Sequence, residues 1–155
     1  MEPGTLCAHV VLMTDSCATY DPGHDIRERT FEFACRVVEF CKSLYDQGGV
    51  ARQMTGQLVN CSTSTAAMLE EARGAESRRD FISKCSISLK EARESHVRLR
   101  VCYRCSLGPH DQSKRLIDEA QQIAAILGAI VRNTRRNAGI AVGTASGSKL
   151  RARSL

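Results

Sequence analysis

The stretch SRRDFISKCSISLKEARE, residues 77–94, decides the fold class of this chain. Its apolar residues recur at intervals of three and four positions, and the same spacing continues beyond the stretch to Tyr103. Residues spaced in this way lie on one face of an α-helix. The face that we predict to be buried consists of Ile82, Cys85, Leu89, Ala92, His96, Leu99 and Tyr103.

Sequence signals mark both ends of this helix. Ser77 and Asp80 have the spacing of a capping box, in which the Ser77 hydroxyl accepts from a free backbone N–H and the acid reaches back toward the cap. At the other end, Gly108-Pro109 cannot continue a helix. We therefore predict that the helix runs from the Ser77 cap to Leu107.

Three further segments show the same amphipathic periodicity. The first covers residues 25–45 and ends before Gly48-Gly49, since consecutive glycines favour a left-handed exit from a helix. The second covers residues 50–72, and the small side chains of residues 61–67 would let a neighbouring helix approach closely. The last covers residues 111–136 and carries an apolar stripe wider than one bundle face requires, which points to self-association.

Short connections between four helices make sequential neighbours antiparallel. We therefore predict an all-α protein, an up-down-up-down antiparallel four-helix bundle over residues 25–136. Residues 1–24 are expected to form a flexible N-terminal segment, within which Met13 offers an alternative start of the chain. Residues 137–155 are expected to form a flexible, basic C-terminal tail.

Composition limits the class of protein. A chain of 155 residues with 43% hydrophobic and 25% charged side chains suits one globular domain. No apolar run approaches the roughly 20 residues that span a bilayer, and the apolar run Leu6–Met13 follows Glu2 rather than a basic region. We expect no membrane partner and no signal peptide. Most of the eight cysteines fall within helical patterns, so we expect reduced thiols in the cytoplasm.

Positive charge is concentrated near the C-terminus. Residues 1–107 carry 14 basic and 14 acidic side chains, whereas residues 108–155 carry 8 basic and 3 acidic ones, so the net charge of +5 lies entirely in the last third. A basic end favours an anionic partner. The candidate nucleic-acid-binding residues are Arg78, Arg79, Arg132, Arg135, Arg136, Lys149, Arg151 and Arg153.

An alternative interpretation of these cations needs no ligand, because basic residues at a helix C-terminus complement the helix dipole. In a ring of subunits, however, the same charges would add into a large positive surface with affinity for a phosphate backbone. Since aromatic side chains do not accompany the arginines, we expect binding that is poor in sequence preference and sensitive to salt.

Catalytic patterns are weak. Cys102 and Cys105 form a CxxC at the C-terminal end of a predicted helix, where the dipole raises a thiol pKa, so packing is favoured over redox or zinc chemistry. The carboxylates of Glu91 and Glu94 have basic neighbours at pairing distance along the helix, such as Arg98. We therefore predict that the protein is not an enzyme and holds neither a cofactor nor a metal ion.

Several strings resemble a known family. Residues 78–94 are similar to the third-helix signature of the bacterial four helix bundle proteins, also called 23S rRNA-intervening sequence proteins. Residues 31–38, 50–53 and 116–120 also fit, so the resemblance covers residues 25–136. The segment His96-Val-Arg-Leu99 departs from the aromatic-rich segment of its relatives, which affects local packing.

The resemblance implies a homopentameric, barrel-like ring. It also connects the chain to the accessory variability protein of diversity-generating retroelements, which has the same fold, binds nucleic acid and partners a reverse transcriptase. We therefore expect a homo-oligomer that binds RNA or DNA through the backbone, either beside a reverse transcriptase or in connection with rRNA intervening sequences. The alternative is a protein-interaction scaffold without a nucleic-acid role.

Overall fold

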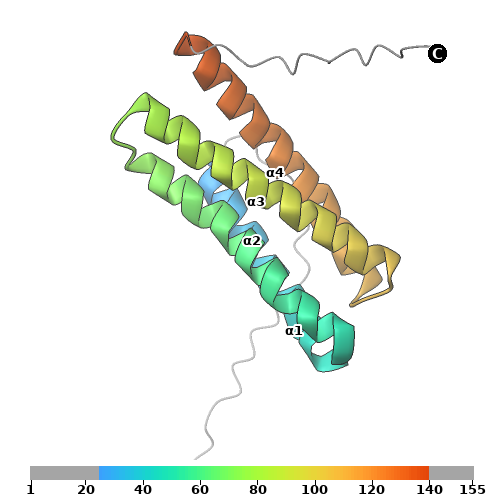
Figure 1. Cartoon of the computed structure of the whole chain (residues 1–155). Coiled ribbons are helices and arrows are strands. Elements are labelled where there is room, and N and C mark those ends of the chain that lie inside the picture. The colour runs from blue at the N-terminus through green and yellow to red at the C-terminus, as the bar shows by residue number, and fades with distance from the viewer. Residues whose placement is uncertain (1–24, 140–155) are drawn as a thin grey trace, which may run out of the picture.

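Four α-helices make up the computed structural model, which describes residues 25–139 (Figure 1). They are α1 (Ile26–Gln47), α2 (Gly49–Arg73), α3 (Arg78–Arg104) and α4 (His110–Asn137). Within the described residues there is no strand, so the all-α class is confirmed. Each observed helix lies within three residues of its predicted bounds. Of the predicted tails, residues 1–24 and 140–155 fall outside the described residues, while Asn137 belongs to α4.

Side-chain caps begin two of the helices, and the sequence predicts the one at Ser77. The Asp25 carboxylate accepts from the Arg27 N–H at 3.1 Å and begins α1. The Ser77 hydroxyl accepts from the Asp80 N–H at 3.1 Å and begins α3. The Asp80 carboxylate reaches back to the N–H of Glu76 at 3.3 Å, one residue before the cap itself. A capping bond of this kind stabilises a helix by about 1 kcal/mol.

The core lies between all four helices and contains few aromatic rings. Phe33 and Phe40 of α1 are its largest side chains, and both are buried. Aliphatic side chains from the other helices surround them, including Leu58, Leu69, Leu89, Leu99, Leu116, Ile123 and Leu127.

Small polar side chains fill the contact between α2 and α3. The Ser88 hydroxyl donates to the carbonyl of Thr65 at 2.7 Å, and the Ser95 hydroxyl lies 3.1 Å from the Cys61 sulfur. The Ser88 bond reaches the backbone of α2, and the close approach of the two helices that it requires is the one predicted from the small side chains of residues 61–67. Among the described residues, no buried side-chain nitrogen or oxygen lacks a hydrogen-bond partner.

The predicted buried face of α3 is partly wrong. His96 and Tyr103 are only partly buried, while Ser88, Ser95 and Cys102 occupy the buried face near them. The predicted C-terminus is also wrong, because α3 ends at Arg104 with Cys105 as its cap rather than at Leu107. The first difference follows from the helical period of 3.6, which rotates a strict seven-residue repeat away from the core over the length of a helix. The second arises because Ser106 adopts a φ of 54° and the Leu107 N–H donates back to the Cys102 carbonyl at 2.8 Å, which closes the helix.

Contacts at the helix ends show which ends lie together. Arg27 at the start of α1 approaches Glu70 at the end of α2, with 3.9 Å between Nη1 and Oε2. Arg78 at the start of α3 donates to the carbonyl of Asn137 at the end of α4, at 3.1 Å. The short connection of residues 74–77 joins these two pairs. The start of α1, the end of α2, the start of α3 and the end of α4 therefore gather at one end of the molecule.

At the opposite end, Gly108 packs against α1. Its N–H donates to Gln47 Oε1 at 3.1 Å, and its φ of 74° lies in the left-handed region that favours glycine. An added Cβ would lie 2.7 Å from a ring carbon of Phe40. Gly108 thus allows the connection between α3 and α4 to turn and to pack closely against the Phe40 ring. No described helix is long and apolar enough to cross a membrane.

Candidate nucleic-acid interface and the groove between α1 and α2

Five of the predicted cations lie at one end of the α3–α4 pair. We call this set the basic corner; it consists of Arg78, Arg79, Arg132, Arg135 and Arg136. The capping box places the first two at the start of α3, and the last turns of α4 carry the other three. The structure therefore brings together residues that are more than 50 positions apart in the sequence.

Contacts between α3 and α4 hold part of the basic corner in place. Arg78 donates to the Asn137 carbonyl at 3.1 Å, and Arg135 Nη2 lies 3.4 Å from the Ser86 hydroxyl. Arg136 donates to Asn133 on its own helix at 3.2 Å. Each of these arginines therefore has a structural contact in the absence of any ligand.

The helix dipole accounts for only some of these charges. Arg135 and Arg136 lie in the last turn of α4, where a cation is favourable. Arg78 and Arg79 lie in the first turn of α3, where the dipole opposes a positive charge. Arg78 is compensated because it caps a carbonyl at the end of α4. Arg79 is exposed, and neither dipole nor capping explains it.

The remaining predicted cations, Lys149, Arg151 and Arg153, lie outside the described residues. The basic corner alone therefore carries the structural argument for an anion-binding surface.

A groove between α1 and α2 is the feature that sequence reasoning missed. It has a volume of about 880 Å³. Its apolar lining consists of Phe31, Ala34, Cys35, Val38, Ala66 and Ala67. Phe31 lies outside the buried stripe of α1 and is 53% exposed. The small residues predicted at 61–67 were the available signal, because Ala66 and Ala67 leave the space that the groove occupies.

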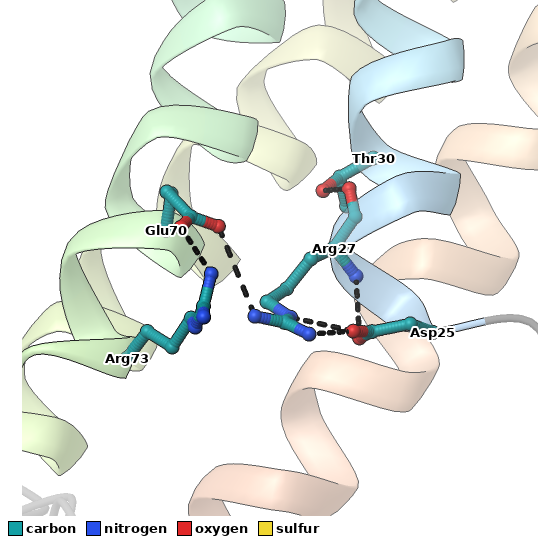
Figure 2. Close-up of polar contacts among 5 residues, drawn as sticks. All are labelled: Asp25, Arg27, Thr30, Glu70 and Arg73. Atoms are coloured by element: carbon teal, nitrogen blue, oxygen red, sulfur yellow. Dashed lines mark hydrogen bonds and ion pairs between the residues drawn. The ribbon is translucent and has the colours of Figure 1, made fainter.

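Paired charges close one end of this groove (Figure 2). Arg27 pairs with the Asp25 carboxylate and faces Glu70 across the groove, and Arg73 contacts the same Glu70 at 3.0 Å. Hydrogen bonding to Arg27 is the largest cause that lowers the pKa of Asp25. These four charges sum to zero, and Glu28 in the first turn of α1 also lines the groove, so its polar rim carries one further negative charge here.

The buried thiols are poor nucleophiles. Burial is the main cause that raises the pKa of Cys41 to about 12 and that of Cys102 to about 11. Cys102 is the first cysteine of the CxxC, and its partner Cys105 is exposed at the end of α3. Because a thiolate is the reactive species, this environment opposes a redox role for the CxxC.

Of the predicted carboxylate pairs, the one between Glu94 and Arg98 is confirmed, and α2 adds a pair that was not predicted. Arg98 pairs with Glu94 at 2.5 Å, and Arg73 pairs with Glu70. His96 lies on the same helix as Glu94, and burial is the main cause that lowers its pKa. Residues 25–139 contain no group of three or more His, Cys, Asp or Glu side chains arranged to hold a metal ion.

A family model described as "23S rRNA-intervening sequence protein" matches residues 23–129, which is more than two thirds of the chain. The chain belongs to the 23S rRNA-intervening sequence protein family. A crystal structure of a protein of unknown function from the S23 ribosomal protein family of Bacteroides thetaiotaomicron is similar in sequence and fold. It is 31% identical with a TM-score of 0.64, and the match covers 70% of this chain and 99% of that chain. No curated protein matches this chain.

The match to the 23S rRNA-intervening sequence protein family divides the basic corner. Arg78 and Arg79 lie inside the matched residues 23–129, and Arg132, Arg135 and Arg136 lie beyond them. The groove between α1 and α2 lies wholly inside the match. The sequence prediction of this family is confirmed.

Proposed function

We propose that this protein is a non-catalytic, homo-oligomeric nucleic-acid-binding or adaptor protein of the cytoplasm. Its partner is RNA or DNA, contacted through the phosphate backbone. The observation that carries the proposal is Arg79, exposed at the start of α3, where the helix dipole opposes a cation. Its neighbour Arg78 contacts the end of α4, which carries the other arginines. The description of the family by 23S rRNA intervening sequences favours RNA over DNA.

The proposed assembly is a ring of five up-down-up-down bundles. The up-down order is supported by the contacts of Arg27 with Glu70 and of Arg78 with Asn137, which join the start of one helix to the end of its neighbour. In such a ring each subunit would place one basic corner at the same end, so five copies would add their charges. A surface of that kind binds phosphate backbones with strong salt dependence.

Association with a reverse transcriptase or with an rRNA intervening sequence is part of this proposal. A gene for a reverse transcriptase beside this one would favour the first, and a location inside a ribosomal RNA gene would favour the second. Both kinds of association would use the basic corner to contact nucleic acid, so the binding experiment below applies to either.

The test is fluorescence anisotropy of a short labelled single-stranded RNA at several salt concentrations. Replacing Arg132, Arg135 and Arg136 together by Ser should abolish binding and leave helicity unchanged, because their contacts are at the protein surface. A single replacement, Arg136→Ser, should leave measurable binding and make the dependence of log K on log salt shallower by about 0.7, the contribution of one phosphate contact on a single strand.

A matched control removes the same charge elsewhere. Lys90, Arg93 and Arg100 are exposed along α3, away from the basic corner, and their triple replacement by Ser should leave most of the binding intact. Equal losses in the two triple variants would show that net charge alone drives binding. Undiminished binding after the change at Arg132, Arg135 and Arg136 would place the site elsewhere.

The second candidate function is a protein-interaction scaffold, and the groove between α1 and α2 favours it. An apolar groove rimmed by polar residues is typical of a protein-contact surface. A scaffold would associate equally at low and high salt, whereas RNA binding through arginines would be lost as salt rises.

A further inference from the structure

The groove between α1 and α2 leaves apolar surface uncovered on an otherwise well packed bundle. Phe31 is 53% exposed, although it shares the groove lining with the apolar side chains of Val38 and Ala67. The groove follows α1 from Asp25 to Glu39, a length of roughly 21 Å at 1.5 Å per residue. An apolar surface of this extent is normally covered by another segment or molecule.

The charges of the rim indicate what kind of occupant fits. Asp25, Arg27, Glu70 and Arg73 pair with one another, and Glu39 pairs with Lys42 at 2.6 Å. Paired charges offer little attraction to a charged segment such as residues 149–153, which carry three cations. Glu28, in the first turn of α1, adds one further negative charge to this rim. The apolar floor and the slightly acidic rim therefore favour an apolar segment that carries no Asp or Glu.

Such a segment precedes α1 in the same chain. Residues 6–13, Leu-Cys-Ala-His-Val-Val-Leu-Met, contain no Asp, Glu, Lys or Arg. The chain joins the bundle at Asp25, which itself lines the groove at its charged end. The intervening residues 14–24 reach about 36 Å when extended, which exceeds the length of the groove.

A covalent tether of this length also favours binding to the same chain. A short flexible linker keeps a segment at an effective concentration in the millimolar range. Weak apolar contacts with the groove are then enough to hold the segment, provided that the linker spans the distance. We propose that residues 6–13 dock in the groove between α1 and α2 of their own chain, against Phe31, Cys35 and Val38.

Native cysteines provide the first test. Cys35 lies in the groove. Cys105 is exposed at the C-terminal end of α3, outside the groove lining, so Cys105 serves as an internal reference. Alkylation of both thiols is followed by mass spectrometry in the 155-residue chain and in a chain that begins at Met13. We expect Cys35 to react at least about fivefold more slowly, relative to Cys105, in the full chain. Equal relative rates in the two chains would overturn the proposal.

The second test distinguishes two occupants of the groove, residues 6–13 of the same chain and a second copy of the protein. Cys7 lies in the proposed segment, so mild oxidation of a Cys17→Ser variant should give an intrachain disulfide between Cys7 and Cys35. A matched variant combines Cys35→Ser with Arg36→Cys, which moves the thiol by one residue to an exposed position outside the groove lining. The native position should cross-link at least about tenfold more than this displaced one.

Each outcome of the cross-linking test supports or contradicts the proposal. Similar disulfide yields from Cys7 to Cys35 and from Cys7 to the displaced thiol would show that residues 6–13 move freely, and the proposal would fail. Mainly interchain disulfides would assign the groove to a second copy, which also contradicts it. As a further check, Phe31→Glu should reduce the Cys7–Cys35 yield, while Tyr45→Glu, an equally exposed aromatic outside the groove lining, should not.

Discussion

The guanidinium of Arg29 forms a bidentate ion pair with Glu119 and so joins α1 to α4. The Nε–Oε1 distance is 2.6 Å and the Nη2–Oε2 distance is 3.0 Å, and Nη2 also donates to Gln122 at 2.7 Å. Among the adjacent helices, α1 and α4 contact each other least. The pair thus acts where apolar packing between neighbours is sparsest.

Removal of this ion pair should destabilise the bundle measurably. The side chains of Arg29 and Glu119 are only 11% and 21% exposed, so solvent screens them less than a surface pair. We expect Arg29→Ala to lower the free energy of unfolding by about 2 kcal/mol in urea denaturation, since a bond to a charged group is worth roughly 1.5–3 kcal/mol. The control Arg98→Ala breaks a more exposed pair with Glu94 and should cost less than about 1 kcal/mol. Equal costs would mean that the α1–α4 contact does not depend on this pair.

Two glycines should respond in opposite directions to alanine. Gly108→Ala should destabilise the protein by more than about 1 kcal/mol, because its φ is +74° and the new methyl would meet the Phe40 ring. Gly56→Ala should stabilise α2 by about 0.5–1 kcal/mol, because nothing lies within 4 Å of the added Cβ. Thermal melts of the two variants check this, and a stabilised Gly108→Ala variant would contradict the observed connection after α3.

A charge on the core face of α3 should unfold the bundle. Leu89 is 9% exposed and belongs to the core, whereas its neighbour Lys90 is exposed. Leu89→Asp buries an uncompensated carboxylate and should cost about 3–5 kcal/mol. Lys90→Asp changes the charge by more and should leave the melting transition nearly unchanged. Circular dichroism melts separate the two, and a Leu89→Asp variant that kept its transition would refute the assigned face.

Alkaline pH should weaken the fold through buried thiols. Burial raises the pKa of Cys41 from 9.0 to about 12, so the unfolded chain ionises this thiol while the folded chain still holds its proton. The unfolded state is therefore favoured as pH rises above 9, and the stability contributed by the neutral thiol is lost by about pH 12. In that window each such thiol should cost about 1.4 kcal/mol per pH unit. Urea denaturation of Cys41→Ala between pH 8 and 10.5, roughly, should show a shallower slope than the native chain; an identical slope would rule the thiol out.

The helices were predictable because local signals and apolar periodicity agree in them. The Ser77 cap, the Gly48-Gly49 break and the stripe of α1 all hold in the structure. The edges of a buried helix face were less predictable, as His96 and Tyr103 show, since a small rotation of the helix moves such a residue out of the core.

The two surface sites differ in how far sequence could reveal them. The arginines of the basic corner were found as charge clusters, but their meeting depends on α3 starting where α4 ends. The groove was not found, because Phe31 has no periodic signature of its own and the space beside it arises from Ala66 and Ala67 on another helix. To predict a site formed by two helices, one must know how the helices pack against each other as well as the apolar periodicity of each.

The measurement that tests the proposed function most directly is light scattering coupled to size exclusion, with and without a short RNA, at low and high salt. The account predicts a particle of five subunits that captures RNA at low salt and releases it at high salt. A particle of the same size that ignores RNA at both salt concentrations would contradict nucleic-acid binding, and a monomer would contradict the ring on which the summed charge of the basic corners depends.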